Sequence, residues 1–84
     1  MNLYLLTQDA QDGYDTYDSV VVCAETEDEA RMIHPSEYRD DWDGKQDSAY
    51  DDSWCNAEDV KVAKIGTAAE HMVKGIVLAS FNAG

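Results

Sequence analysis

The chain opens with two stretches whose apolar pattern is typical of β-strands. Strand-forming residues fill positions 2–8, and turn-forming residues occupy positions 8–13. A β-branched run at Val20, Val21 and Val22 then predicts a second strand, because such runs occur where a strand is buried on at least one face. The run favours a central place in a sheet.

Two further strands are predicted near the end of the sequence. Val60 and Val62 lie on one face of an alternating stretch, with Lys61 on the other, before Ile65 breaks the alternation. The apolar stretch at positions 74–82 predicts the last strand.

Between these two pairs of strands, the clearest local signal is a helix start at Thr26. Glu29 follows three residues later, which is the spacing of a capping box. The residues that share one side at helical spacing, and that can lie on a sheet, are Ala30 and Ile33. Pro35 ends the predicted helix after about two to three turns. His34, near that end, is expected to cap the helix as a cation when it is protonated.

The order of these segments predicts an α+β fold. Two strands, a helix, a long loop and two more strands suit a small two-layer domain, in which a mostly antiparallel sheet of three or four strands carries one short helix on a face. A chain of 84 residues supports one core, so residues 1–84 are expected to form a single domain.

Residues 36–56 have no sustained apolar period and are predicted to form a long acidic loop. Positions 36–54 contain seven carboxylates, two Tyr and two Trp, against two basic residues. Loops above ~15 residues in compact domains are usually functional or disordered. The tryptophans, Trp42 and Trp54, allow two interpretations: they anchor the loop on the core, or they face a partner.

Charge is the most unusual property of the composition. The sequence has 18 Asp and Glu residues and 6 Lys and Arg residues, which gives a net charge of −12. Such a chain repels nucleic acid and anionic membranes, so we expect a cationic partner such as a basic protein surface. The alternative is that the charge serves only solubility.

Motifs for catalysis or for metal binding are absent from the sequence. The sixth position from Asp41 is Gln46, whereas a calcium-binding EF-hand loop requires Gly there. Two Cys and two His match a zinc ligand set by count, but no two of them are closely spaced. The scattered glycines form no phosphate-binding loop. We therefore expect no enzyme, no cofactor and no metal, and two reduced thiols at Cys23 and Cys55.

Aromatic residues interleaved with acids indicate instead a protein-binding surface. Tyr and Trp are frequent interface hot spots, and carboxylates beside them match Lys and Arg on a partner. The residues that we assign to this contact are Asp40, Asp41, Trp42, Asp43, Tyr50, Asp51, Asp52 and Trp54, with Asp12, Tyr14, Asp15 and Asp18 as a second patch. The oligomeric state stays open, because an exposed edge strand can pair with its copy.

Two stretches carry a resemblance to a known group of proteins. "GYDTYDSVVVCAETEDEARMIHP" at positions 13–35 and "GIVLASFNAG" at positions 75–84 resemble short phage-encoded proteins of similar length and segment order, to which no common activity is assigned. The resemblance implies a phage or prophage origin and a location in the cytoplasm of the bacterial host. In charge and size the chain is also similar to anti-CRISPR proteins and DNA mimics.

These observations lead to one expected function and two alternatives. We expect a phage accessory protein that binds a basic surface of a host nucleic-acid-handling or defence complex and inhibits it, without contacting nucleic acid or membrane itself. The first alternative is a structural or assembly protein of the virion. The second is a solvated acidic domain that binds divalent cations.

Overall fold

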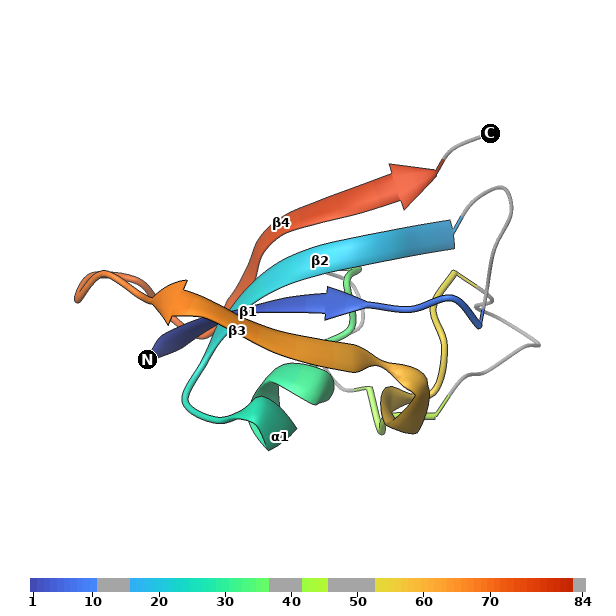
Figure 1. Cartoon of the computed structure of the whole chain (residues 1–84), viewed down its shortest axis with the longest axis horizontal. Coiled ribbons are helices and arrows are strands. Elements are labelled where there is room, and N and C mark those ends of the chain that lie inside the picture. Colours follow the sequence, from blue (N-terminus) through green and yellow to red (C-terminus); the bar gives the residue numbers. More distant parts are fainter. Residues whose placement is uncertain (11–15, 37–41, 46–52, 83–84) are drawn as a thin grey trace.

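The predicted strands pair into one four-stranded antiparallel sheet in the computed structural model (Figure 1). The structure describes residues 1–10, 16–36, 42–45 and 53–82. The strands are β1 (Asn2–Thr7), β2 (Thr16–Ala24), β3 (Lys61–Thr67) and β4 (Gly75–Asn82), in the order β3-β1-β2-β4. This architecture confirms the predicted α+β class and the central position of the valine-rich strand.

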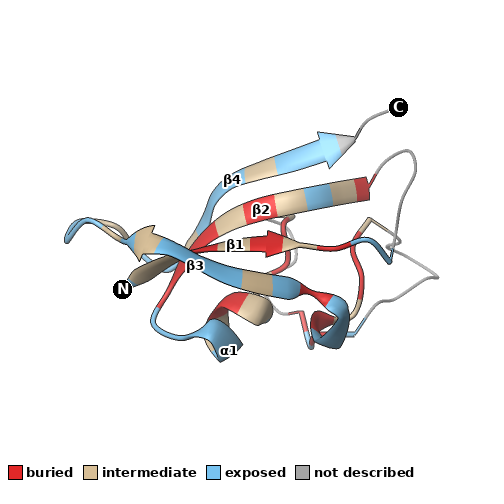
Figure 2. Ribbon diagram, in the orientation of Figure 1, coloured by how far each residue is buried: buried red, intermediate tan, exposed pale blue. Residues whose placement is uncertain are grey.

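The core lies on one face of the central strands. Tyr4 is paired with Val22 and Leu6 with Val20, and all four side chains are buried. Because alternate residues of a strand point to opposite faces, these pairs form a continuous apolar surface on one side of β1 and β2. Figure 2 shows the result: buried residues concentrate in the two central strands, whereas β3 and β4 at the edges are largely exposed.

The helix α1 (Glu27–Arg31) starts as predicted and ends earlier than predicted. The Thr26 hydroxyl accepts a hydrogen bond from the Glu29 backbone N–H at 3.2 Å, which confirms the N-cap. The expected two to three turns are reduced to five residues. The helix closes early on tighter hydrogen bonds, from the Met32 and Ile33 N–H groups to the Glu29 and Ala30 carbonyl oxygens, and Pro35 prevents it from continuing.

A layer of short segments covers the apolar face of the sheet. It consists of α1, the 3₁₀ helix η1 (Ala57–Asp59) and the segments at residues 42–45 and 53–56. Trp42, Trp54 and Cys55 from this layer are buried in the same core as the strand residues. Both tryptophans therefore anchor the acidic loop on the core, which is one of the two interpretations that the sequence left open.

Arg31 and Gly44 join the parts of this layer to one another. The Arg31 guanidinium donates hydrogen bonds to the carbonyl oxygens of Ala57, at 3.1 Å, and of Val60. Gly44 accepts a hydrogen bond from the Ala57 backbone N–H at 2.7 Å. Hydrogen bonds to backbone carbonyl oxygens thus hold together the end of α1, the turn at residues 42–45 and η1.

The same junction makes Gly44 sensitive to substitution. Its φ of 86° lies in the left-handed region, and an added Cβ would lie 2.9 Å from two atoms of the Met32 side chain. We expect Gly44→Ala to lower the free energy of unfolding by about 1–3 kcal/mol, measured by urea denaturation. The control is Gly66→Ala, where an added Cβ meets no atom within 4 Å. Equal stability of the two variants would contradict the geometry at Gly44.

His34 differs from its predicted role. The side chain is buried, and its Nδ1 accepts a hydrogen bond from the Ser36 backbone N–H at 3.0 Å. Its ring meets the Trp42 ring edge-on, with 5.2 Å between centroids. A ring nitrogen that accepts a hydrogen bond carries no proton there. The expectation that His34 caps the helix as a cation is therefore wrong: His34 is a core residue that orders the chain after α1.

Within the described residues, no helix has the length and the apolar character needed to cross a membrane.

Candidate protein-interaction surface

Most residues of the predicted contact lie outside the described part of the chain. These are Asp12, Tyr14, Asp15, Asp40, Asp41, Tyr50, Asp51 and Asp52. Of the other four, Asp18 and Asp43 are exposed, whereas Trp42 and Trp54 are buried in the core. The structure therefore leaves the two described carboxylates available to a partner and gives the two tryptophans a structural role.

Asp43 is held in a defined turn rather than on an irregular loop. Its Oδ1 accepts a hydrogen bond from the Lys45 backbone N–H at 3.0 Å, which closes an Asx turn. The Trp42 indole Nε1 donates to the Lys45 carbonyl oxygen at 2.8 Å, and Gly44 supplies the left-handed conformation between them. Trp42 thus fixes the position of the Asp43 carboxylate by inserting its own ring into the core.

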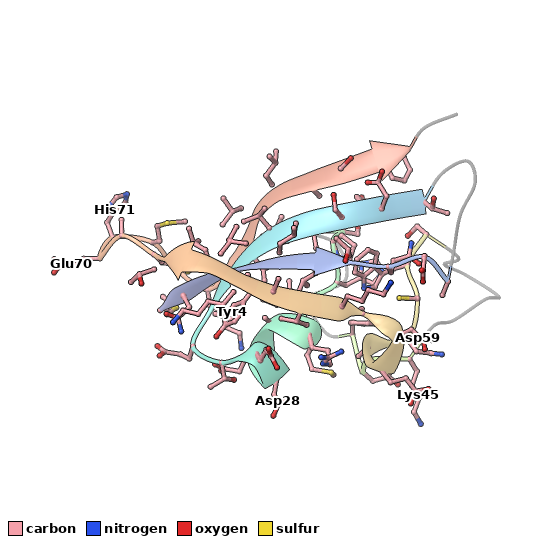
Figure 3. The ribbon with its side chains drawn as sticks, in the orientation of Figure 1. Tyr4, Asp28, Lys45, Asp59, Glu70 and His71 are labelled. Carbon is pink, nitrogen blue, oxygen red and sulfur yellow. The ribbon has the colours of Figure 1, made fainter. Side chains whose placement is uncertain are left out.

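Exposed acids concentrate on the layer that covers the sheet. We call this surface, together with the residue that leads into the Thr26 cap of α1, the acidic layer; its members are Glu25, Glu27, Asp28, Asp43, Glu58 and Asp59, all of them exposed. Figure 3 shows Asp28 and Asp59 beside α1 and η1, with Lys45 nearby. Arg31 belongs to the same layer, but its guanidinium is turned inward to the Ala57 and Val60 carbonyls.

The strands carry far less negative charge than the acidic layer. Their charged residues are Asp18, Lys61 and Lys64, and β1 and β4 have none. Outside the strands and the layer, Asp9 pairs with Lys61 at 3.2 Å on the surface. The described residues therefore separate an acidic side, formed by α1 and η1, from a sheet with little charge.

The face of the sheet opposite α1 is apolar and bears no described element. The cross-strand pairs Leu3 with Cys23 and Leu5 with Val21 lie on this face, and Leu78 pairs with Val21 from β4. Leu78 is 69% exposed. Large exposed apolar residues on an edge strand are unusual, since they favour association.

A groove runs between β4 and the helix layer. It encloses about 1140 Å³, and the residues that line it include Tyr17, Glu29, Ile33, Pro35, Ile76 and Ala79. Lys74, at the start of β4, lies at one end, where its Nζ is 3.4 Å from Oε1 of Glu29. The groove therefore combines an apolar floor with two carboxylates, Asp28 and Glu29, and one amine, Lys74.

Sequence reasoning did not single out Glu29, Lys74 or Ile76 as surface residues for binding. Glu29 was identified only by its capping-box spacing, and Ile76 only as part of a predicted strand. The available signal was the composition of the last strand, where eight residues include no charge and no proline.

Metal-binding and thiol chemistry find no support among the residues that the structure describes. No cluster of three or more His, Cys, Asp or Glu side chains there could hold a metal ion. Cys23 and Cys55 are free and buried. His71 lies with Glu70 at the turn between β3 and β4, far from the helix layer (Figure 3).

Cys55 is expected to make the fold less stable at alkaline pH. Burial of the thiol, and secondarily the charges of Asp59 and Asp9, raise the pKa of Cys55 from 9.0 to about 11. As the pH rises, the thiol therefore loses its proton at a lower pH in the unfolded chain than in the folded chain. The contribution to stability is thus present below pH about 9 and is lost as the pH rises toward 11.

We expect the free energy of unfolding to fall by about 2–3 kcal/mol more in the native protein than in Cys55→Ala over that pH range. Urea denaturation at several pH values between 8 and 11 measures the difference. Parallel pH profiles for the two proteins would contradict burial of this thiol.

No protein-family model, curated protein or solved structure matches the chain, so the resemblance to phage-encoded proteins stays a prediction.

Proposed function

We propose that this chain is a phage accessory protein that binds a basic surface of a host nucleic-acid-handling complex and inhibits it. The observation that carries the proposal is the separation of charge: among the described residues, six exposed acids occupy the acidic layer against one exposed cation, Lys45, while the Arg31 guanidinium is used internally. A surface with a large excess of one sign of charge attracts the opposite sign and accelerates encounter with it.

A protein that normally binds nucleic acid offers the matching surface. Such proteins present Lys and Arg side chains to a phosphate backbone that carries one charge per about 1.7 Å of duplex axis. Carboxylates fixed on α1, η1 and the turn at Asp43 can occupy the same basic groove, since their backbone is held by the Arg31 and Gly44 contacts. Inhibition follows because the groove is then closed to its nucleic acid.

The experiment is a tagged pull-down from bacterial lysate at roughly 0.1 M and 0.5 M salt, with mass spectrometry of the captured proteins. We expect a nucleic-acid-binding complex at low salt and its loss at high salt. Binding of duplex DNA by the captured complex should decrease when the protein is added. Capture of virion proteins alone, from infected cells, would contradict the proposal.

A charge-reversal pair locates the contact. Glu25→Lys with Glu58→Lys shifts the charge of the acidic layer by +4, and Asp9→Lys with Glu70→Lys makes the same shift elsewhere on the surface. The first pair should abolish capture and the second should retain most of it, because only the first changes the layer. Equal loss in both would mean that net charge alone, rather than the acidic layer, attracts the partner.

A further inference from the structure

The two edges of the sheet are protected to different degrees. β3 carries Lys61 and Lys64 on its exposed edge, and charged edge residues discourage pairing with another strand. β4 has neither a charged residue nor a proline, and within the described residues it pairs only with β2. Its exposed side chains are mainly apolar: Ile76, Val77, Leu78 and Phe81. The backbone groups on the outer side of β4 are therefore accessible to an added strand.

The groove beside β4 lies where the side chains of such a strand would point. An added strand directs alternate side chains to the helix side of the sheet. On that side, Ile76 and Ala79 of β4 face Ile33 and Pro35, which follow α1, across the groove. Tyr17 contributes to the same lining and packs against Phe81, with 4.7 Å between ring centroids. Apolar side chains of an extended peptide match this lining.

Glu29 adds a charge requirement to the apolar groove. Its Oε1 faces Lys74 at 3.4 Å, but its Oε2 is inaccessible to solvent and accepts no hydrogen bond from any described residue. An inaccessible carboxylate oxygen without a donor is unfavourable, and a cationic donor is its strongest partner. The Glu29 side chain as a whole is 39% exposed, so a rotation of its carboxylate brings this oxygen to the groove. A Lys or Arg side chain that enters the groove beside Lys74 would then supply the donor.

We propose that this groove binds an extended basic segment of a partner protein, which pairs with β4 as a fifth strand and places a Lys or Arg side chain against Glu29. Main-chain hydrogen bonds to β4 supply affinity, and the alternate side chains supply specificity, as in other cases of strand addition. The inference rests on the proposed function in one respect, since it specifies the kind of basic partner that the acidic protein recognises.

Charge complementarity favours this occupant over a second copy of the chain. A second β4 placed on the edge would bring an uncharged strand to Glu29, and each copy carries a net charge of −12. The β2–β4 pairing leaves out Asp18 of β2 and Val77 of β4, and the bulge at Val77 bends the edge strand. A bent edge suits a short added segment better than a long continuous strand.

The test uses a fluorescent peptide of eight residues, the length of β4, with serine at the even positions and valine at every odd position except one, which carries lysine. The valines and the lysine of this peptide then lie on one face, toward the groove. Binding is followed by anisotropy at roughly 0.1 M salt. We expect Glu29→Gln to weaken binding about tenfold, because the charge-assisted contact is lost, and Glu27→Gln to weaken it less than about twofold. Glu27 is the matched control, since it lies on the same helix, is exposed and does not line the groove.

Two further peptides separate strand pairing from general attraction. The same sequence with every backbone amide methylated should lose binding, because it cannot donate to β4. The same peptide with glutamate in place of the lysine should not bind. Equal affinities of Glu29→Gln and Glu27→Gln, binding of the methylated peptide, or no binding of the lysine peptide at about 1 mM would each overturn the proposal.

Light scattering of the free protein tests whether a second copy of the chain occupies the β4 edge. A dimer of the free protein that the lysine peptide does not dissociate would mean that a second copy holds the β4 edge, which also overturns the proposal. None of these measurements uses the lysate partner. A negative peptide result with a positive pull-down would therefore reject the groove and leave the acidic layer as the contact.

Discussion

Replacing Trp54 by alanine is expected to lower the free energy of unfolding by about 3–5 kcal/mol, the largest effect of any single change considered for this protein. Trp54 is 1% exposed and packs in the core cluster with Tyr4, Leu6 and Val20. Removal of the indole leaves a cavity between the sheet and the segment that leads into η1. Because the core of an 84-residue chain is small, such a loss approaches the total stability of a typical domain.

Urea denaturation followed by far-ultraviolet circular dichroism measures the effect. The control is Phe81→Ala, which removes an aromatic side chain that is 46% exposed and should cost less than about 1.5 kcal/mol. Trp54→Phe gives a second comparison, since the Trp54 Nε1 donates to no acceptor among the described residues and the phenyl ring loses no hydrogen bond. A loss below about 1 kcal/mol in Trp54→Ala would place this side chain outside the core.

The second large effect is expected at Arg31. Arg31→Ala removes the donor for the Ala57 and Val60 carbonyls and should lower the free energy of unfolding by about 2–4 kcal/mol. The two carbonyls lie at the start and just beyond the end of η1. Loss of the hydrogen bonds to them therefore separates α1 from η1 and from β3, the strand that follows η1. The acidic layer would then lose its fixed arrangement together with its stability.

Two variants of basic residues test whether geometry or charge is responsible. Arg31→Lys keeps the charge but replaces the planar guanidinium with a single amine, so we expect an intermediate loss. Lys45→Ala removes a charge from the same layer at an exposed position and should change stability by no more than about 0.5 kcal/mol. Equal losses in Arg31→Ala and Lys45→Ala would mean that charge, and not the pair of carbonyl contacts, explains the effect.

These two residues also bear on the proposed function. Trp54 and Arg31 contribute no exposed group to the acidic layer, yet both hold the backbone on which its carboxylates stand. A variant that loses partner binding through either residue has lost the arrangement of the acids, whereas Glu25→Lys with Glu58→Lys changes the acids alone. Stability measurements on each variant therefore need to accompany the pull-down.

Local features of the sequence predicted the secondary structure well. The valine run of β2 and the alternation around Val60 and Val62 depend on burial of one face, and the N-cap at Thr26 depends on a hydrogen bond between residues three positions apart. The end of α1 was less predictable, because the apolar spacing of Ala30 and Ile33 continues past Arg31, where the helix ends.

The candidate site was only partly predictable, because local patterns do not show which side chains the tertiary structure buries. Acidity and aromatic content were visible in the sequence, but the sequence did not decide whether an aromatic ring lies on the surface or in the core. Trp42 and Trp54 are buried because the sheet has an apolar face that five residues of helix cannot cover, and large rings from the loop fill the remaining area.

By itself, the sequence determined the four strands, the helix start and the excess of negative charge, since each depends on neighbouring residues or on composition. Only the tertiary structure decided which side of the molecule is acidic, that Arg31 is turned inward, and that β4 forms an unprotected edge beside a groove at Glu29. The physical reason is that these properties arise from contacts between segments far apart in the chain. Strand order and burial set those contacts, and local patterns indicate them only in part, as in the central place of the valine-rich strand.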